Sequence, residues 1–158
     1  GITRDGTLKK MSEDNWRAVI ATNMDSAFNV TRHVINGMLE KGWGRIVNIA
    51  SVNGQRGQFG QANYSAAKAG MHGFTMAVAL ETAAKGITVN TVSPGYIATA
   101  MTQAMPENVL ESIVNSVPMR RMGTPEEIAN AVAWLASEGN GYTTGANIPV
   151  NGGLFTSH

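Results

Sequence analysis

Two short β-branched segments separated by a long helical stretch constrain the fold of this chain most strongly. Residues 45–50 (Arg-Ile-Val-Asn-Ile-Ala) and residues 87–92 (Ile-Thr-Val-Asn-Thr-Val) are typical of buried strands. Residues 64–85 between them are mostly small or apolar, which predicts a helix of about six turns. A strand, a long helix and a second strand make the repeating unit of a parallel sheet, with a right-handed crossover. The sequence therefore predicts an α/β fold.

Further helices are predicted on both sides of this unit. Ser12 is placed to cap a helix whose apolar positions continue to Lys41, straight or kinked, with Asn23 on the apolar stripe. Thr124-Pro125-Glu126-Glu127 has the features of a strong helix start, and we expect this helix to end near Ser137. The remaining expected elements are a glycine-rich loop at residues 51–63, a weak helix at residues 107–117 and a last strand at residues 146–150.

Composition excludes several classes of protein. The 158 residues, 43% of them hydrophobic, are enough for one packed domain. A net charge of +1 without any Lys/Arg run argues against nucleic-acid binding and against a polybasic membrane patch. No apolar run approaches the roughly 20 residues that span a bilayer. We therefore expect no nucleic-acid partner and no membrane association.

Residue usage also bears on location, metals and assembly. The absence of cysteine is compatible with a reducing compartment, so we expect a cytoplasmic protein. His33, His72 and His158 are far apart in sequence and show no metal spacing, so no metal site is expected. Charged residues make up 15% of the chain against a usual value of about 25%. A surface this poor in charge predicts an oligomer.

Tyr64-Ser65-Ala66-Ala67-Lys68, at the start of the long helix, is the most informative motif. Residues four apart share a helix face, so the Lys68 ammonium can lie near the Tyr64 phenol. A free tyrosine has a pKa near 10 and is a poor acid-base group at neutral pH unless a cation and a bound cofactor lower that pKa. The spacing fits a proton-donating tyrosine, although a surface Tyr/Lys pair has the same spacing.

Ser51 and the segment Ser93-Pro94-Gly95 follow the two predicted strands. In α/β folds ligand-binding groups gather at the carboxyl ends of strands, so both are expected at one edge together with Tyr64. Asn23 is a polar residue on an apolar helix stripe, where a buried amide needs partners. It is interpreted either as an active-site residue or as a structural amide.

A phosphate-binding loop is not found where a dinucleotide fold requires one. Gly42-Trp43-Gly44 follows a helix and precedes a strand, the reverse of the required order. Gly54, Gly57 and Gly60 have the wrong spacing. We expect that the first half of a dinucleotide-binding sheet is missing from this chain.

Taken together, these motifs resemble the short-chain dehydrogenase/reductase family and, within it, the acetoacetyl-CoA reductases of polyhydroxybutyrate synthesis. The motifs are Asn23, Asn48-Ile49-Ala50-Ser51, the Tyr64-to-Lys68 segment and Asn90-Thr91-Val92-Ser93-Pro94-Gly95. The resemblance implies that residues 1–158 are a single domain, the C-terminal two thirds of a Rossmann-like doubly wound parallel sheet. It also implies that an N-terminal third with the phosphate-binding part is absent.

The resemblance assigns roles to individual residues. Tyr64 would protonate the carbonyl oxygen during hydride transfer, and Lys68 would lower the tyrosine's pKa and hold the nicotinamide ribose. Ser51 would hydrogen-bond the substrate oxygen and Asn23 would position water in a proton relay. The residues that the resemblance places at the cofactor are Gly1, Ile2, Tyr64, Lys68, Pro94, Gly95, Ile97 and Thr99. Those it places at the substrate are Asp5, Gln58, Phe59, Gln61 and Tyr96.

The function that the resemblance implies is transfer of a hydride from NADPH to the 3-keto group of acetoacetyl-CoA, giving 3-hydroxybutyryl-CoA, with NADH as the other possible donor. A 3-oxoacyl-[acyl-carrier-protein] reductase is the alternative, and the pair Arg120-Arg121 is the candidate docking patch for an acidic carrier. A third hypothesis is a non-catalytic fragment that forms the oligomer. The resemblance implies a homotetramer with an acyl-CoA substrate.

Overall fold

The computed structural model describes residues 1–156 and confirms the α/β class. Its sheet has the order β1-β2-β3 and is parallel throughout. The strands are β1 (Gly44–Ile49), β2 (Ile87–Pro94) and β3 (Asn147–Val150). Gly44 pairs with Ile87 and Ile49 with Val92, so β1 and β2 run side by side along the whole of β1.

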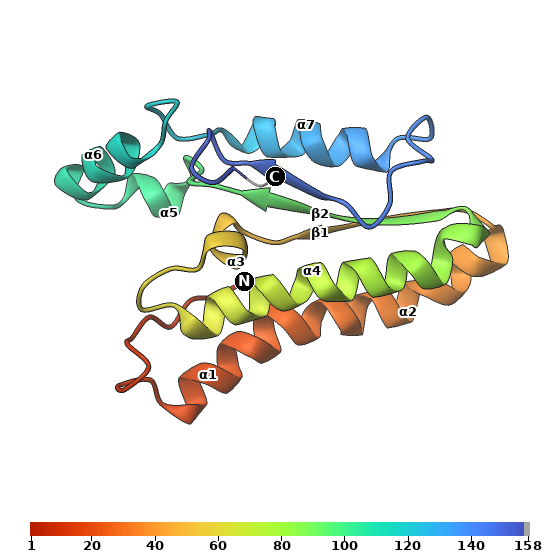
Figure 1. Ribbon diagram of the computed structural model, residues 1–158, viewed down its shortest axis with the longest axis horizontal. Helices are drawn as coiled ribbons and strands as arrows, with labels where there is room; N and C mark the ends of the chain where they lie inside the picture. Colours follow the sequence, from red (N-terminus) through yellow and green to blue (C-terminus); the bar gives the residue numbers. More distant parts are fainter. Residues whose placement is uncertain (157–158) are drawn as a thin grey trace.

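Helices cover both faces of the sheet (Figure 1). The helices α2 and α4 lie along one face and α7 lies along the other, as expected of part of a Rossmann-like sheet. The helices are α1 (Glu13–Ile20), α2 (Ser26–Lys41), α3 (Val52–Arg56), α4 (Ala62–Thr82), α5 (Ala100–Gln103), α6 (Glu107–Ser116) and α7 (Pro125–Ala136). A π-helical segment, η1 (Ala21–Asp25), joins α1 to α2, and a 3₁₀ turn, η2 (Ala83–Lys85), follows α4.

The first long helix begins at its predicted cap and contains an irregular turn. The Ser12 hydroxyl accepts a hydrogen bond from the amide of Asn15 at 3.2 Å. The π-helical turn η1 contains Asn23, which is 2% exposed. Such turns are frequent at functional sites. Gly42, at a φ of 63°, ends the helix at the predicted position.

The sequence predicted a loop over residues 51–63. This prediction is wrong in part, because the segment contains the short helix α3. Glycine and asparagine have low helix propensity, and the segment has three glycines, so no helix was expected here. The short helix forms because Ser51 caps it, with the serine hydroxyl accepting from the Asn53 amide at 3.1 Å, and because it packs against α4. Helix α4 begins two residues before its predicted start.

The apolar core lies between the sheet and α4. Every residue of β2 except Pro94 is buried, which explains its run of branched side chains. Ile87 and Val89 pack with Ala79 of α4, and each buried Ile or Val contributes about 1.5–3 kcal/mol. Within residues 1–156, no helix combines the length and the hydropathy needed to cross a bilayer.

Candidate active site

Ser51, Tyr64 and Lys68 meet at the carboxyl edge of the sheet. Pairing with β2 continues one residue beyond β1, since the amide of Ala50 donates to the carbonyl of Val92 at 2.8 Å. Ser51 is the next residue and therefore lies at the end of the strand. Tyr64 and Lys68 lie in the first two turns of α4, the helix against which α3 packs. The convergence of the strand ends with the start of the long helix is therefore confirmed.

Lys68 is buried and reaches back to β1. Its ammonium donates to the carbonyl oxygen of Ile49 at 2.7 Å and lies 5.8 Å from the centroid of the Tyr64 ring. Burial lowers the pKa of Lys68. An ammonium carries three donors, and among residues 1–156 the bond to Ile49 uses one of them. Two donors are left for a ligand at this edge.

Burial and two nearby side chains set the pKa of the Tyr64 phenol. Burial is the largest cause and raises the pKa of the phenol above its ordinary value, while the Ser51 side chain lowers it and the Asp5 carboxylate raises it. The phenol is therefore protonated at neutral pH.

Both polar atoms of the Asn23 side chain are hydrogen-bonded to backbone. Its amide nitrogen donates to the carbonyls of Ile2 at 2.8 Å and Val19 at 2.9 Å, and its oxygen accepts from the amide of Ile2 at 3.1 Å. The side chain also lies against Gly1. Of the two interpretations of Asn23, this geometry favours a structural amide that fixes residues 1–2 beside the first helix.

The predicted substrate residues lie mostly around the loop that precedes α4. The side-chain amide of Gln61 donates to the Asp5 carboxylate at 2.9 Å, and its oxygen accepts from Asn53 at 3.0 Å. The Phe59 side chain is 88% exposed, and Gln58 accepts from Arg56 at 3.3 Å. Asp5 and Gln61 are thus joined directly, whereas Gln58 and Phe59 lie at the rim.

The predicted cofactor residues after β2 form a tight connection across the sheet edge. Pro94 ends β2, and the amide of Gly95 donates to the carbonyl of Val150 at 2.9 Å. Ile97 pairs with Gly123 in an isolated bridge. Thr99 caps α5 through a capping box, so its hydroxyl already has a partner within the chain.

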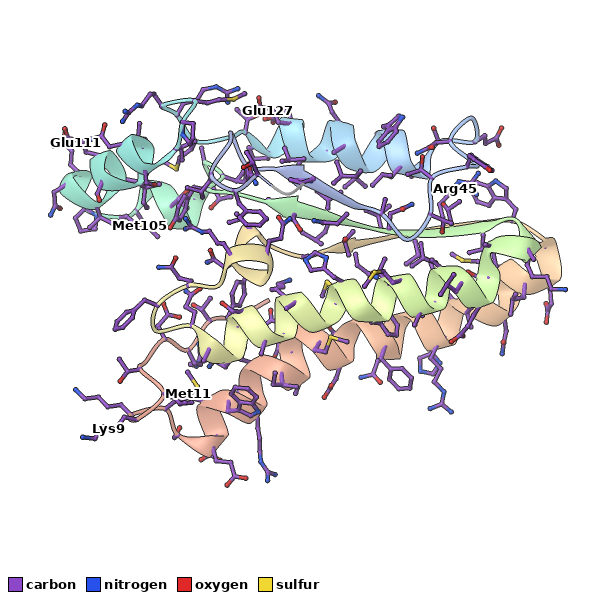
Figure 2. The ribbon with its side chains drawn as sticks, in the orientation of Figure 1. Lys9, Met11, Arg45, Met105, Glu111 and Glu127 are labelled. Carbon is purple, nitrogen blue, oxygen red and sulfur yellow. The ribbon has the colours of Figure 1, made fainter. Side chains whose placement is uncertain are left out.

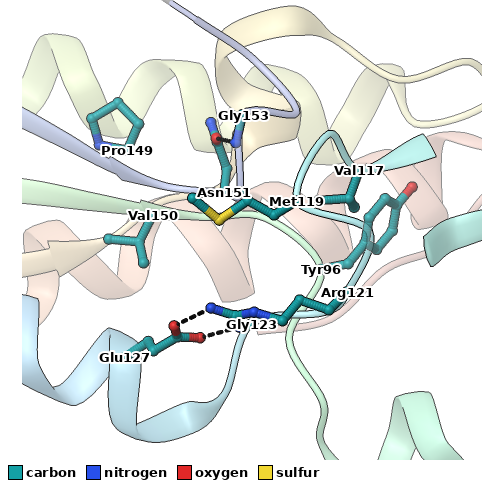
Figure 3. A pocket seen from close by; sticks show the side chains of 11 residues that line it. Tyr96, Val117, Met119, Arg121, Gly123, Glu127, Pro149, Val150, Asn151 and Gly153 are labelled. Carbon is teal, nitrogen blue, oxygen red and sulfur yellow. Dashed lines mark hydrogen bonds and ion pairs between the residues drawn. The ribbon is translucent and has the colours of Figure 1, made fainter. Parts of the chain in front are cut away.

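Tyr96 lies apart from the other predicted substrate residues. It lines a cavity of about 350 Å³ at the end of β3, together with Met119, Asn151 and the ion pair of Arg121 with Glu127 (Figure 3). A second cavity, of about 540 Å³, lies along β1 and is lined by Gly1, Asn23, Lys68 and other residues of α2, β1 and α4. The structure therefore does not place Tyr96 in the same cavity as Lys68.

Sequence reasoning missed Asn63, the residue before the tyrosine. It is fully buried, and its side-chain nitrogen donates to the carbonyl of Arg4 at 3.0 Å while its oxygen accepts from the Tyr64 amide at 2.8 Å. This links the N-terminal segment to the first turn of α4. An amide directly before a predicted helix is a capping signal that would have found it.

Among residues 1–156 no three or more His, Asp or Glu side chains lie close enough together to hold a metal ion. His33 is exposed, and His158 lies outside the described residues. His72 contacts the Thr91 hydroxyl at 3.1 Å through Nδ1, but its buried Nε2 has no partner in the described part of the chain. Burial lowers the pKa of His72.

Known proteins resemble this chain over nearly its whole length. An acetoacetyl-CoA reductase of Allochromatium vinosum is 68% identical, and one of Cupriavidus necator is 63% identical, each over 98% of this chain and 63% of the relative. A 3-oxoacyl-[acyl-carrier-protein] reductase of Pseudomonas aeruginosa is 49% identical over 99% of this chain and 64% of the relative. The chain thus spans a little under two thirds of the length of these curated relatives.

A family model described as Enoyl-(Acyl carrier protein) reductase matches residues 1–155. This match covers almost every residue that the structure describes, including the whole carboxyl edge of the sheet. The chain therefore belongs to this reductase family, within the short-chain dehydrogenases/reductases.

Proposed function

We propose that the protein is a nicotinamide-dependent reductase that converts acetoacetyl-CoA to 3-hydroxybutyryl-CoA, as in polyhydroxybutyrate synthesis. The observation that carries the proposal is the meeting of Ser51, Tyr64 and Lys68 at the carboxyl edge of the sheet. The names of the two relatives at 68% and 63% identity support the choice of substrate. NADPH is the proposed hydride donor and NADH the alternative.

In the proposed mechanism Tyr64 is the acid. The cofactor supplies the hydride for the 3-keto carbon when it is bound. The Tyr64 hydroxyl donates its proton to the carbonyl oxygen, and the raised pKa of the phenol keeps that proton in place until charge develops on the oxygen. The Ser51 hydroxyl donates a hydrogen bond to the same oxygen, and the Lys68 ammonium stabilises the phenolate that is left.

The residues present fit one end of a nicotinamide cofactor. The two remaining donors of Lys68 suit the hydroxyls of a ribose, and Gly1, Ile2, Pro94, Gly95, Ile97 and Thr99 are proposed to line the nicotinamide end. The cradle for the pyrophosphate does not fit here, because the glycines between β1 and α4, which are Gly54, Gly57 and Gly60, do not have the spacing of a phosphate-binding turn. We propose that another part of the protein holds the phosphates.

We also propose that the sheet continues beyond β1 in the complete protein. Among residues 1–156, β1 pairs on one side only, with β2. The cavity of about 540 Å³ runs along its other side, between β1 and α2. A free strand edge beside a cavity is suited to receive a further strand, which agrees with a single domain of which residues 1–158 are the C-terminal two thirds.

The hydrogen bonds of the basic pair, Arg120 and Arg121, favour an acyl-CoA substrate over a carrier-protein substrate. Arg121 is held by Glu127 through two hydrogen bonds of 2.8 and 2.7 Å, and Arg120 donates to the carbonyl of Asn115 at 2.7 Å. The ion pair with Glu127 makes Arg121 a weak docking point for an acidic carrier, whereas Arg120 is bonded to neutral acceptors and keeps its charge. Asp5, Gln58, Phe59 and Gln61 are the proposed contacts to the acetoacetyl group, and Tyr96 is proposed as a further contact from the separate cavity at the end of β3.

A homotetramer in the cytoplasm is proposed for the complete protein. Exposed apolar side chains on α2 and α4, among them Phe28, Val30 and Leu80, support burial of these faces against other copies. Leu80 is 85% exposed. The absence of cysteine supports a reducing compartment. Light scattering of the purified protein tests the assembly, and a monomer would contradict it.

The test of the proposed activity is oxidation of NADPH by the purified protein with acetoacetyl-CoA. Turnover is expected, and Tyr64→Phe should lower kcat by about 10²–10⁴-fold while leaving the Kd for NADPH unchanged. Tyr142→Phe is the matched control, because Tyr142 is fully exposed in the loop before β3. Full turnover of the Tyr64→Phe protein would refute the role of the tyrosine. A preference for acetoacetyl carrier protein would favour the alternative substrate.

A further inference from the structure

We infer that Gly54, which no motif singled out, is a positioning residue that sets the distance between the Ser51 and Tyr64 hydroxyls. The inference rests on the proposed function, because it concerns the pair of hydroxyls that would hold the substrate oxygen. Gly54 lies in α3, the short helix that the sequence did not predict. Its role follows from how closely α3 approaches α4.

The backbone of α3 touches the backbone of α4 at Gly54. A Cβ atom on Gly54 would lie 2.7 Å from the carbonyl carbon of Lys68, 2.9 Å from its Cβ and 2.9 Å from the amide nitrogen of Ala69. These atoms belong to the interior of a regular helix and cannot turn aside as a flexible side chain can. Any side chain at residue 54 must therefore push α3 away from α4.

A side chain at residue 54 is excluded by contact with α4 and not by the backbone conformation of the residue. Gly54 is not among the glycines with positive φ, so its backbone conformation is open to other residues. In a helix, alanine is intrinsically more favourable than glycine. A loss caused by Gly54→Ala would thus run against helix propensity and would report the contact with α4.

A shift of α3 is passed directly to Ser51. The amide of Gly54 donates to the carbonyl of Ser51 at 2.9 Å, and the amide of Asn53 donates to the Ser51 hydroxyl at 3.1 Å. Ser51 is therefore fixed by the first turn of the helix that it caps. Tyr64 and Lys68 are fixed on the other side of the contact, in α4. A shift of α3 away from α4 would therefore move Ser51 relative to Tyr64.

The kinetic test compares Gly54→Ala with Gly139→Ala in the complete protein. Gly139 is a matched control, because a Cβ there meets nothing within 4 Å and its φ is not positive. Gly54→Ala should lower kcat by about ten- to hundredfold with the KM for NADPH within about twofold, whereas Gly139→Ala should change neither. In a Ser51→Ala background, Gly54→Ala should lower kcat by less than about twofold further, because the two changes remove the same interaction.

A second readout does not depend on turnover. The pKa of Tyr64, followed by NMR of ¹³C-labelled tyrosine and assigned with Tyr64→Phe, should rise in Gly54→Ala as much as in Ser51→Ala, because both remove the lowering influence of the serine. Absence of turnover in the unsubstituted protein would refute the proposed function alone, and this titration would then decide the role of Gly54.

Three results would overturn the inference. The first is an unchanged kcat and an unchanged Tyr64 pKa in Gly54→Ala. The second is a double variant whose fold-decrease in kcat equals the product of the decreases caused by Gly54→Ala and Ser51→Ala alone. The third is a Gly54→Ala protein without native circular dichroism, which would make the close approach a requirement of folding and not of the position of Ser51.

Discussion

A positively charged side chain lies at each end of β1, half-buried at one end and buried at the other. The two differ in how many backbone carbonyls they bind. Arg45, labelled in Figure 2, lies at the amino end of the strand, and Lys68 of α4 reaches the carboxyl end. Arg45 donates to the carbonyls of Gly44, Gly86, Ser137 and Glu138 at 2.9–3.4 Å. Lys68 donates to the carbonyl of Ile49.

This difference indicates that Arg45 stabilises the fold, whereas Lys68 has donors left to bind a ligand. The four carbonyls at Arg45 come from the start of β1, the turn before β2 and the end of α7, so the guanidinium joins three segments that are distant in sequence. Its planar fork has few donors left, whereas the ammonium of Lys68 has two. Stability is therefore expected to depend on the amino end of β1 and turnover on the carboxyl end.

The largest expected effect is that of Lys68→Met on turnover. Methionine keeps the length and the packing of the side chain but provides no donor and no charge. We expect kcat to fall by about 10²–10³-fold, while the free energy of unfolding stays the same or rises, because a desolvated ammonium is removed. Steady-state kinetics and urea unfolding on one preparation measure both. A large loss of stability with normal turnover of the folded protein would reverse the assignment.

Arg45→Met should show the opposite pattern. Four carbonyls lose a charged donor, and the substitution should cost about 2 kcal/mol of unfolding free energy, with kcat of the folded protein within about twofold of the original. Urea unfolding and kinetics on the same sample are the measurements. Arg45→Lys is the control for charge, and it should recover only part of the stability because a lysine cannot reach all four carbonyls.

His72, midway along α4, should make stability sensitive to mild acid. Its pKa is lowered by burial, so below the ordinary value of about 6.5 the unfolded chain binds a proton that the folded chain resists. Stability should therefore be fully present above that pH and decline as the pH falls through the lowered pKa. Urea unfolding between pH 7.5 and pH 5 measures the slope, and His72→Asn should flatten it. An equal slope in both proteins would contradict this account.

The smallest effect is expected at the exposed pair of Arg121 and Glu127. The hydrogen bonds from Arg121 and from the Thr124 amide lower the pKa of Glu127 to about 2, so its contribution is present at neutral pH and is lost only as the pH falls towards 2. Glu127→Gln preserves the capping box and removes the charge, and should lower Tm by no more than about 3 °C. A larger drop would mean that the cavity at Tyr96 depends on this pair.

The regular elements of the fold could be predicted because their signals are local. Each of three signals lies within a few residues of the element that it predicts: the branched run of β2, the Ser12 cap and the Thr124 capping box. Helix α3 could not be predicted in this way, because its stability comes from packing on α4, where glycine permits contact between backbones. Intrinsic propensity is overridden by tertiary contacts at such a site.

The candidate site was predictable in its membership and less so in its detail. The spacing of Tyr64 and Lys68 and the strand-end position of Ser51 placed these residues correctly at one edge. The direction of the Tyr64 pKa shift depends on burial and on Asp5, which lies far away in sequence, so no local pattern contained it. Asn63 was overlooked among the other amides of its segment, although its position directly before the predicted start of the helix at residue 64 was informative.

Transfer of deuterium is the most direct test of the central claim, that this edge of the sheet supports hydride transfer to a 3-keto carbon. The protein is supplied with acetoacetyl-CoA and NADPH deuterated at the transferring position of the nicotinamide, and the product is examined by NMR. Deuterium on C3 of 3-hydroxybutyryl-CoA is predicted, with its formation abolished by Lys68→Met and retained in Arg45→Met. A product without deuterium at C3, or equal labelling by both variants, would contradict the account.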